Sequence, residues 1–97
     1  MYQYSFAGFR SESGEYEYVF LVGTGRSAGK RVRLVLPAAD VQEWAGRGRE
    51  LTASERYGIA KVCLKFAMDR WPDPNSAEAE IRPDQAEIAA VADLLDL

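Results

Sequence analysis

Large apolar side chains alternate with polar ones along the first third of the chain, and they keep to even-numbered positions. These are Tyr2, Tyr4 and Phe6, then Tyr16, Tyr18, Phe20 and Val22, then Val32, Leu34 and Leu36. Because strand side chains alternate between two faces, each run predicts a strand with one apolar face. Antiparallel pairing of 2–9 with 16–22, and of 16–22 with 30–36, brings all even positions to one face. The pattern therefore predicts a three-stranded antiparallel meander over residues 1–36.

Helical signals follow the meander. Pro37 can open a short helix over 38–46, because a first helical turn does not need the missing N–H. The segment Thr52-Ala53-Ser54-Glu55 matches a capping box and predicts a helix over 53–71. After a polar loop, a last helix is predicted over 83–96, with two acids near its C-terminal end that oppose the helix dipole.

The helix over 53–71 is apolar on about two-thirds of its circumference, which predicts a long central helix between the sheet and another element. Residues expected to be buried are Phe20, Leu34, Val62, Phe66 and Ile88, and residues expected to be exposed are Lys61 and Lys65. The fold class is therefore α+β, in the order β-β-β-α-α-α, as a single domain over 1–97. We interpret the even sheet face as its core rather than as an aromatic platform that stacks bases, because the apolar helices need a surface to cover.

The amino-acid composition is that of a small globular protein rather than of a membrane protein or a disulfide-rich secreted one. The chain has 97 residues, of which 47% are hydrophobic and 28% charged, as in an ordinary globular domain. No apolar run reaches the roughly 18–20 residues of a membrane span, and no signal peptide is evident. A single cysteine excludes an internal disulfide, so we expect a cytoplasmic protein without a membrane partner.

Candidate chemistry is sparse, and we expect no enzyme, cofactor or metal. The chain has no histidine, the commonest general base and metal ligand. Cys63 lies on the apolar arc of its helix and is expected to be a core thiol. Glu15 and Glu17 are expected to be solvated strand acids, with Glu17 diagonal to Arg33. The Gly-rich loop 23–30 lacks the spacing of a phosphate-binding loop and leads into a strand, so we interpret it as a flexible hairpin.

The odd face of the predicted sheet carries more apolar residues than a solvated face usually holds. Phe9 falls on this face, together with a cluster of apolar residues in the middle of the sheet. Two explanations are open: the last helix crosses behind the sheet, or another molecule binds there. The partner-binding residues predicted under the second explanation are Val19, Leu21, Val35, Arg31, Arg33 and Glu17.

These observations favour a small non-enzymatic binding or regulatory protein that associates stoichiometrically with a protein partner or with itself. An adaptor or an inhibitor, including one encoded by a phage, fits this description. An enzyme that works without histidine is a further alternative.

The other alternative is a nucleic-acid-binding module. Its residues would be Arg26, Lys30, Arg31, Arg33, Arg47 and Arg49. The order of three strands and a helix is similar to that of plant AP2-type and integrase N-terminal DNA-binding domains, but none of their motifs is present. The overall acidity, with a pI near 4.9, argues against this alternative.

Overall fold

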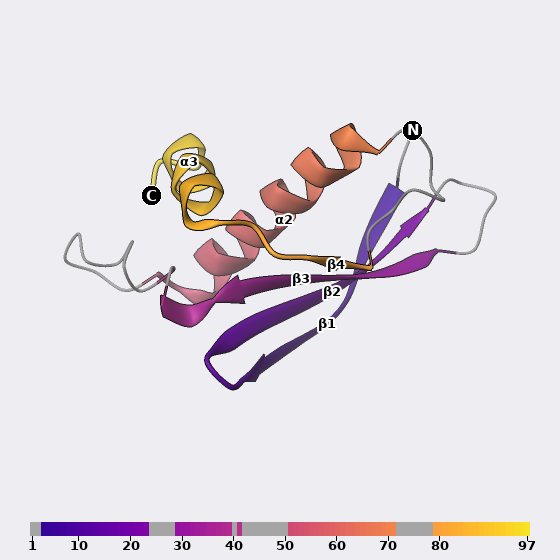
Figure 1. The fold of residues 1–97 in the computed structure, drawn as a ribbon, viewed down its shortest axis with the longest axis horizontal. Coiled ribbons are helices and arrows are strands. Elements are labelled where there is room, and N and C mark those ends of the chain that lie inside the picture. The colour runs from indigo at the N-terminus through magenta and orange to yellow at the C-terminus, as the bar shows by residue number, and fades with distance from the viewer. Residues whose placement is uncertain (1–2, 24–28, 40, 42–50, 72–78) are drawn as a thin grey trace.

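The computed structural model shows an α+β fold with a mostly antiparallel sheet and helices packed on it (Figure 1). The residues that it describes are 3–23, 29–39, 41, 51–71 and 79–97. The elements are β1 (Gln3–Glu12), β2 (Glu15–Gly23), β3 (Lys30–Pro37), α2 (Ala53–Arg70), β4 (Glu80–Ile81) and α3 (Gln85–Leu94). The strands lie in the order β1-β2-β3-β4. The predicted antiparallel pairing of the first three strands is confirmed.

A tight turn joins β1 to β2. Ser13 and Gly14 have φ values of 52° and 77°, and positive φ at both central residues is typical of a two-residue type I′ hairpin turn. Strand β1 therefore continues to Glu12, beyond the predicted pairing segment 2–9, and the loop is correspondingly short.

A β-bulge shifts the register within β1. Phe6 lies opposite Phe20, but Gly8 lies opposite Val19, so Ala7 is the extra residue. Beyond the bulge, odd positions of β1 share a face with even positions of β2. Phe9 therefore lies opposite Tyr18, with ring centroids 5.0 Å apart. The prediction that Phe9 belongs to the odd face is wrong, because strict alternation holds only in a strand without a bulge.

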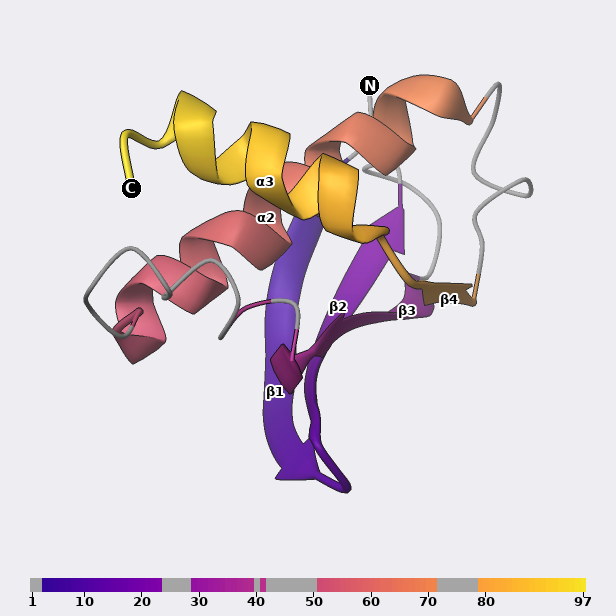
Figure 2. The same ribbon diagram turned by 60° about the vertical axis from the view of Figure 1, so that its left-hand side comes forward.

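The even positions of β2 and β3 form the core, as predicted. Tyr18, Phe20, Val22, Val32, Leu34 and Leu36 are all buried. Both helices lie on this inner face of the sheet (Figures 1 and 2). The opposite, outer face carries the odd positions of β2 and β3, so the predicted alternative in which the last helix crosses behind the sheet is wrong.

The helices α2 and α3 run antiparallel to each other. Arg70 at the end of α2 pairs with Glu87 in the first turn of α3, with Nη1 and Oε1 3.7 Å apart. At the other end, Leu95 lies 3.5 Å from where a β-carbon on Gly58 would stand. The predicted capping box is present: the Thr52 hydroxyl accepts from the N–H of Glu55, and the Glu55 carboxylate accepts from the N–H of Thr52.

The end of α3 is closed by backbone hydrogen bonds. Asp96 has a φ of 61°, and the N–H groups of Asp96 and Leu97 donate to the carbonyls of Asp93 and Ala92. This pairing is the Schellman motif, here with aspartate in the left-handed position that glycine usually takes. Leu97 then packs against the core, which offsets the unfavourable acids at this helix end.

The helical part of the prediction needs correction. The described residues hold two helices rather than three, and most of the predicted helix 38–46 lies outside them; Ala38, Ala39 and Val41 are helical. The helix α2 is not a central one, because Val62 and Phe66 are only half-buried and one strip of it faces solvent. Lys65 is exposed as predicted, whereas Lys61 is half-buried.

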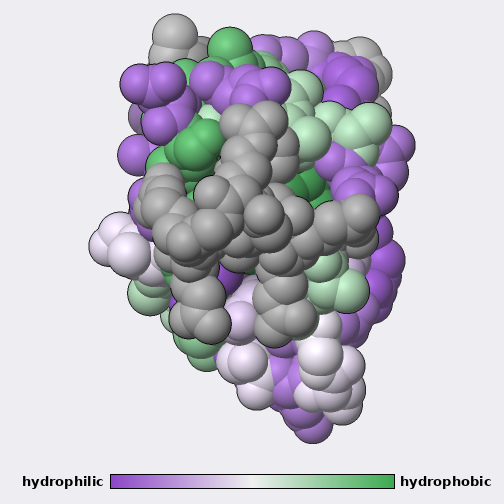
Figure 3. Space-filling view, turned by 90° about the vertical axis from the view of Figure 1, so that its left-hand side faces the viewer, coloured by the Kyte–Doolittle hydropathy of each residue, from purple (hydrophilic) through white to green (hydrophobic). Residues whose placement is uncertain are grey.

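The sheet has a fourth strand that the sequence pattern did not predict. Strand β4 pairs in parallel with β3, with Arg33 opposite Glu80 and Leu34 opposite Ile81. It lies in the polar stretch before the last helix, for which the sequence predicts a loop, because two residues are too few to show an alternating pattern. On the face shown in Figure 3, hydrophobic residues (green) reach the surface at several places among hydrophilic ones (purple).

A pair of phenylalanine substitutions tests the extent of the core. Phe20 is fully buried, so Phe20→Ala should lower the free energy of unfolding by about 3–5 kcal/mol. Phe66 is half-buried at the flank of α2, so Phe66→Ala should cost roughly half as much. Urea unfolding followed by circular dichroism measures both. Equal losses would show that α2 is enclosed on the Phe66 side as well.

Candidate functional site

A network of ion pairs covers much of the outer face. The guanidinium of Arg33 lies 2.6 Å from Oε1 of Glu17 and 2.7 Å from Oε1 of Glu80. Arg10 adds a contact of 2.8 Å to the other oxygen of Glu17. The predicted diagonal placement of Glu17 and Arg33 is therefore confirmed. The prediction that Glu17 is a solvated acid is wrong, because its side chain is only 13% exposed and is engaged by two arginines.

The network continues to the turn and to β4. Arg82 pairs with Glu15 of β2 and with Glu80 of its own segment. Val35 lies among these side chains, in a hollow that Glu17 and Arg33 also line, and is only 1% exposed. Because each of these arginines meets carboxylates, the charges of the outer face largely cancel.

The predicted partner-binding residues do not form one exposed apolar patch. Val35 is buried and Val19 is half-buried, whereas Leu21 is 43% exposed. Arg31, opposite Leu21, is exposed and belongs to no ion pair among the described residues.

The nucleic-acid set is divided in the structure. Arg26, Arg47 and Arg49 lie outside the described residues. Lys30 and Arg31 are neighbours on β3, so their side chains leave the strand on opposite faces. Arg33 is already engaged by Glu17 and Glu80.

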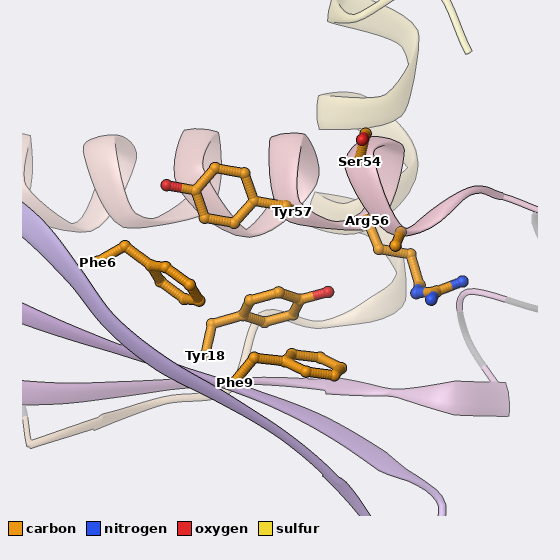
Figure 4. A pocket seen from close by; sticks show the side chains of 7 residues that line it. Phe6, Phe9, Tyr18, Ser54, Arg56 and Tyr57 are labelled. Atoms are coloured by element: carbon orange, nitrogen blue, oxygen red, sulfur yellow. The ribbon is translucent and has the colours of Figure 1, made fainter.

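An aromatic cavity lies on the other side of the sheet, between β1 and the first turns of α2 (Figure 4). Its volume is about 320 Å³. Its lining residues are Phe6, Phe9, Tyr18, Ala53, Ser54, Arg56 and Tyr57. The rings of Phe6 and Tyr57 are 5.1 Å apart at one end, and those of Phe9 and Tyr18 continue the wall.

Phe6 and Phe9 are 47% and 49% exposed, although both take part in this wall. Exposed aromatic side chains that border a concave surface mark an interaction site more often than scattered apolar ones do. The sequence pattern misses this site because strict alternation, without the bulge, puts Phe9 on the opposite face. An uncharged, aromatic-rich stretch over 3–9 was the signal that could have indicated it.

Arg56 closes the other end of the cavity. Its Nη1 donates to the carbonyl of Leu51 at 2.8 Å, and its Cζ lies 4.5 Å from the ring centroid of Tyr16. Its Nε is buried without a hydrogen-bond partner. Burial raises the pKa of the Tyr18 hydroxyl, and the neighbouring Arg56 guanidinium opposes that rise. Arg56 forms no ion pair with any described residue.

Cys63 is buried in the core, as its position on the helix predicted. Burial raises the pKa of its thiol to about 12. Because the thiolate is the reactive form, this cysteine is a poor nucleophile in the folded protein. In the part of the chain that the structure describes, no three His, Cys, Asp or Glu residues are grouped to hold a metal ion.

Comparisons with family models, with curated proteins and with solved structures gave no match to this chain. Among the described helices, none combines the length and the hydropathy that crossing a membrane requires.

The outer-face network should make stability depend on pH. The hydrogen bond that Arg10 donates to Glu17 is the main reason why the pKa of the Glu17 carboxyl lies below its usual value of 4.5. A carboxyl group whose pKa is lower in the folded than in the unfolded protein stabilises the folded state. This stabilisation is complete above the unfolded-state pKa and is lost as the pH falls through the folded-state pKa. The Tm difference between wild type and Glu17→Gln should therefore be positive at pH 6 and shrink toward zero below pH 4.5. A difference that stays constant to pH 2 would contradict this.

The thiol of Cys63 should be protected by the fold. At pH 8, iodoacetamide should leave it unmodified in native protein and alkylate it rapidly in urea, as intact mass would show. Rapid modification without denaturant would mean that α2 opens readily or that the thiol is accessible.

Proposed function

We propose that this chain is a non-enzymatic binding protein that associates stoichiometrically with a protein partner or with itself, as an adaptor or an inhibitor does. The observation that carries this proposal is the exposed edge strand β1, whose two phenylalanines are about half exposed beside an aromatic cavity. A cytoplasmic location belongs to the same proposal and rests on the single cysteine.

The backbone of β1 supports the proposal. β1 is the outermost strand of the sheet, and no described strand pairs with its free side. An antiparallel edge strand directs alternate N–H and C=O groups outward, where another strand can bind them. Residues 3–9 of β1 carry no charge, whereas Arg10 and Glu12 follow near the turn. Because edge charges discourage pairing, the uncharged half is the better docking segment.

The apolar contribution can be estimated. Two half-exposed phenylalanines offer roughly 200 Å² of apolar surface, worth about 5 kcal/mol at about 25 cal/mol per Å². Association itself costs on the order of 4–15 kcal/mol. The two rings alone are therefore insufficient, and a stable complex also needs backbone pairing or a side chain in the cavity.

The outer face is the weaker candidate for the same function. Leu21 and Val19 offer less exposed apolar surface there, and Val35 offers almost none. The nucleic-acid alternative loses support for a related reason, because Arg33 already meets two carboxylates. We therefore place the partner at β1 and use the outer face as the comparison surface.

Two matched substitutions test this placement. Phe9→Thr removes an exposed ring and keeps a good strand former, and Leu21→Glu puts a charge on the outer face. Both variants should stay folded by circular dichroism. Phe9→Thr should weaken association at least tenfold, and Leu21→Glu should leave it unchanged.

Light scattering over a concentration series measures self-association. Quantitative pull-down from the native host, followed by calorimetry with the purified partner, measures a heterologous complex and its stoichiometry. Loss of binding in Leu21→Glu alone would move the interface to the outer face. A monomer that captures nothing at either surface would refute the proposal.

A further inference from the structure

We infer that the aromatic cavity receives a large apolar side chain whose neighbouring carboxylate pairs with Arg56, both from an extended segment of the partner. This inference rests on the proposed function and specifies the chemistry that β1 and α2 recognise together.

The shape and lining of the cavity fit an apolar side chain. A volume of about 320 Å³ is at the small end of the range of ligand pockets. Four aromatic rings, those of Phe6, Phe9, Tyr18 and Tyr57, form its walls. Aromatic rings attract one another in tilted and edge-on geometries, which the existing Phe6–Tyr57 pair already adopts at 69°. An inserted phenyl or isobutyl group would complete this cluster.

The positive charge of Arg56 at the end of the cavity indicates the second feature of the ligand, which is a carboxylate. Arg10, Arg33 and Arg82 each contact one or more carboxylates. Arg56 instead meets a backbone carbonyl and tyrosines, and its Nε has no partner. A guanidinium beside apolar walls is costly without a counter-charge. A carboxylate delivered by a ligand would supply that charge through strong, charge-assisted hydrogen bonds.

The neighbouring edge strand indicates that the ligand is a peptide segment rather than a free small molecule. A strand that pairs with β1 directs every second side chain toward the inner face, alongside Phe6 and Phe9. Figure 4 shows the rings of Phe6 and Tyr57 at one end and Arg56 at the other, beyond the hydroxyl of Tyr18. The segment would thus be fixed by its backbone, with an anchor side chain in the cavity and an acid beside it.

Two small probes test the chemistry of the cavity on the wild-type protein. The probes are 3-phenylpropionate and its neutral isostere 3-phenylpropionamide, titrated by NMR on the ring signals of Tyr57 and Phe9. We expect millimolar binding of the acid and about tenfold weaker binding of the amide, as loss of one charged hydrogen bond implies. Equal affinities would overturn the role of Arg56.

Two matched variants test whether Arg56 is the residue whose positive charge binds the acid. Arg56→Gln should weaken binding of the acid about tenfold and leave binding of the amide unchanged. Lys65→Gln removes one positive charge from an exposed position of the same helix and should change neither. An equal effect of both variants would mean that only the overall charge matters. If Arg56→Gln does not fold, the acid–amide comparison still decides.

A further experiment tests whether the ligand is a peptide segment rather than a free small molecule. A capped strand-forming hexapeptide with a central Phe-Thr-Asp sequence, which places the ring and the carboxylate on the same face of the strand, should bind more tightly than 3-phenylpropionate and shift backbone amides over residues 3–9. Equal affinity without those shifts would overturn the peptide source. A partner that is lost with Phe9→Thr but is insensitive to Arg56→Gln would overturn this inference and leave the proposed association intact.

Discussion

The packing of α2 against the inner face of β2 and β3 is the constraint on which the rest of the structure depends. Phe20, Leu34 and Leu36 from the sheet and Ile59 and Leu64 from α2 are fully buried. Burial on this scale is the main favourable term in folding. It sets the register of the strands, because a slip of one residue would turn the core side chains of the slipped strand to the outer face.

This constraint explains which parts of the fold the sequence could predict. Alternation at even positions predicted the core face of β2 and β3, and the capping box at Thr52 predicted where α2 begins. Both signals are local and strong. Phe9 was misplaced because a bulge at Ala7 leaves no mark in a pattern of alternating residues. Strand β4 was missed because its partner β3, rather than its own two residues, makes it a strand.

The aromatic cavity could not be predicted from the sequence, because it depends on features that local patterns do not show. The diagonal position of Glu17 relative to Arg33 follows from register alone and was predicted, whereas the ion pair between them was not. The aromatic cavity needs the bulge, which turns Phe9 inward, and the angle at which α2 crosses the sheet, which brings Tyr57 to Phe6. Neither is encoded in a short sequence window. Val35 shows a further limit of the pattern, which left open whether the last helix or another molecule covers it. The charged side chains of the outer face cover it instead.

The two faces of the sheet thus differ in how their charges are satisfied. On the outer face, Arg10, Arg33 and Arg82 meet glutamates within the chain, so a ligand of these three side chains would have to break existing pairs before making new ones. On the inner side, α2 covers the centre of the sheet and leaves the rings of β1 at its rim, with Arg56 held by neutral groups. A carboxylate arriving there displaces no internal partner of comparable strength. This difference in how charge is satisfied, together with the exposed rings of Phe6 and Phe9, is why we propose the inner rim as the surface for a partner.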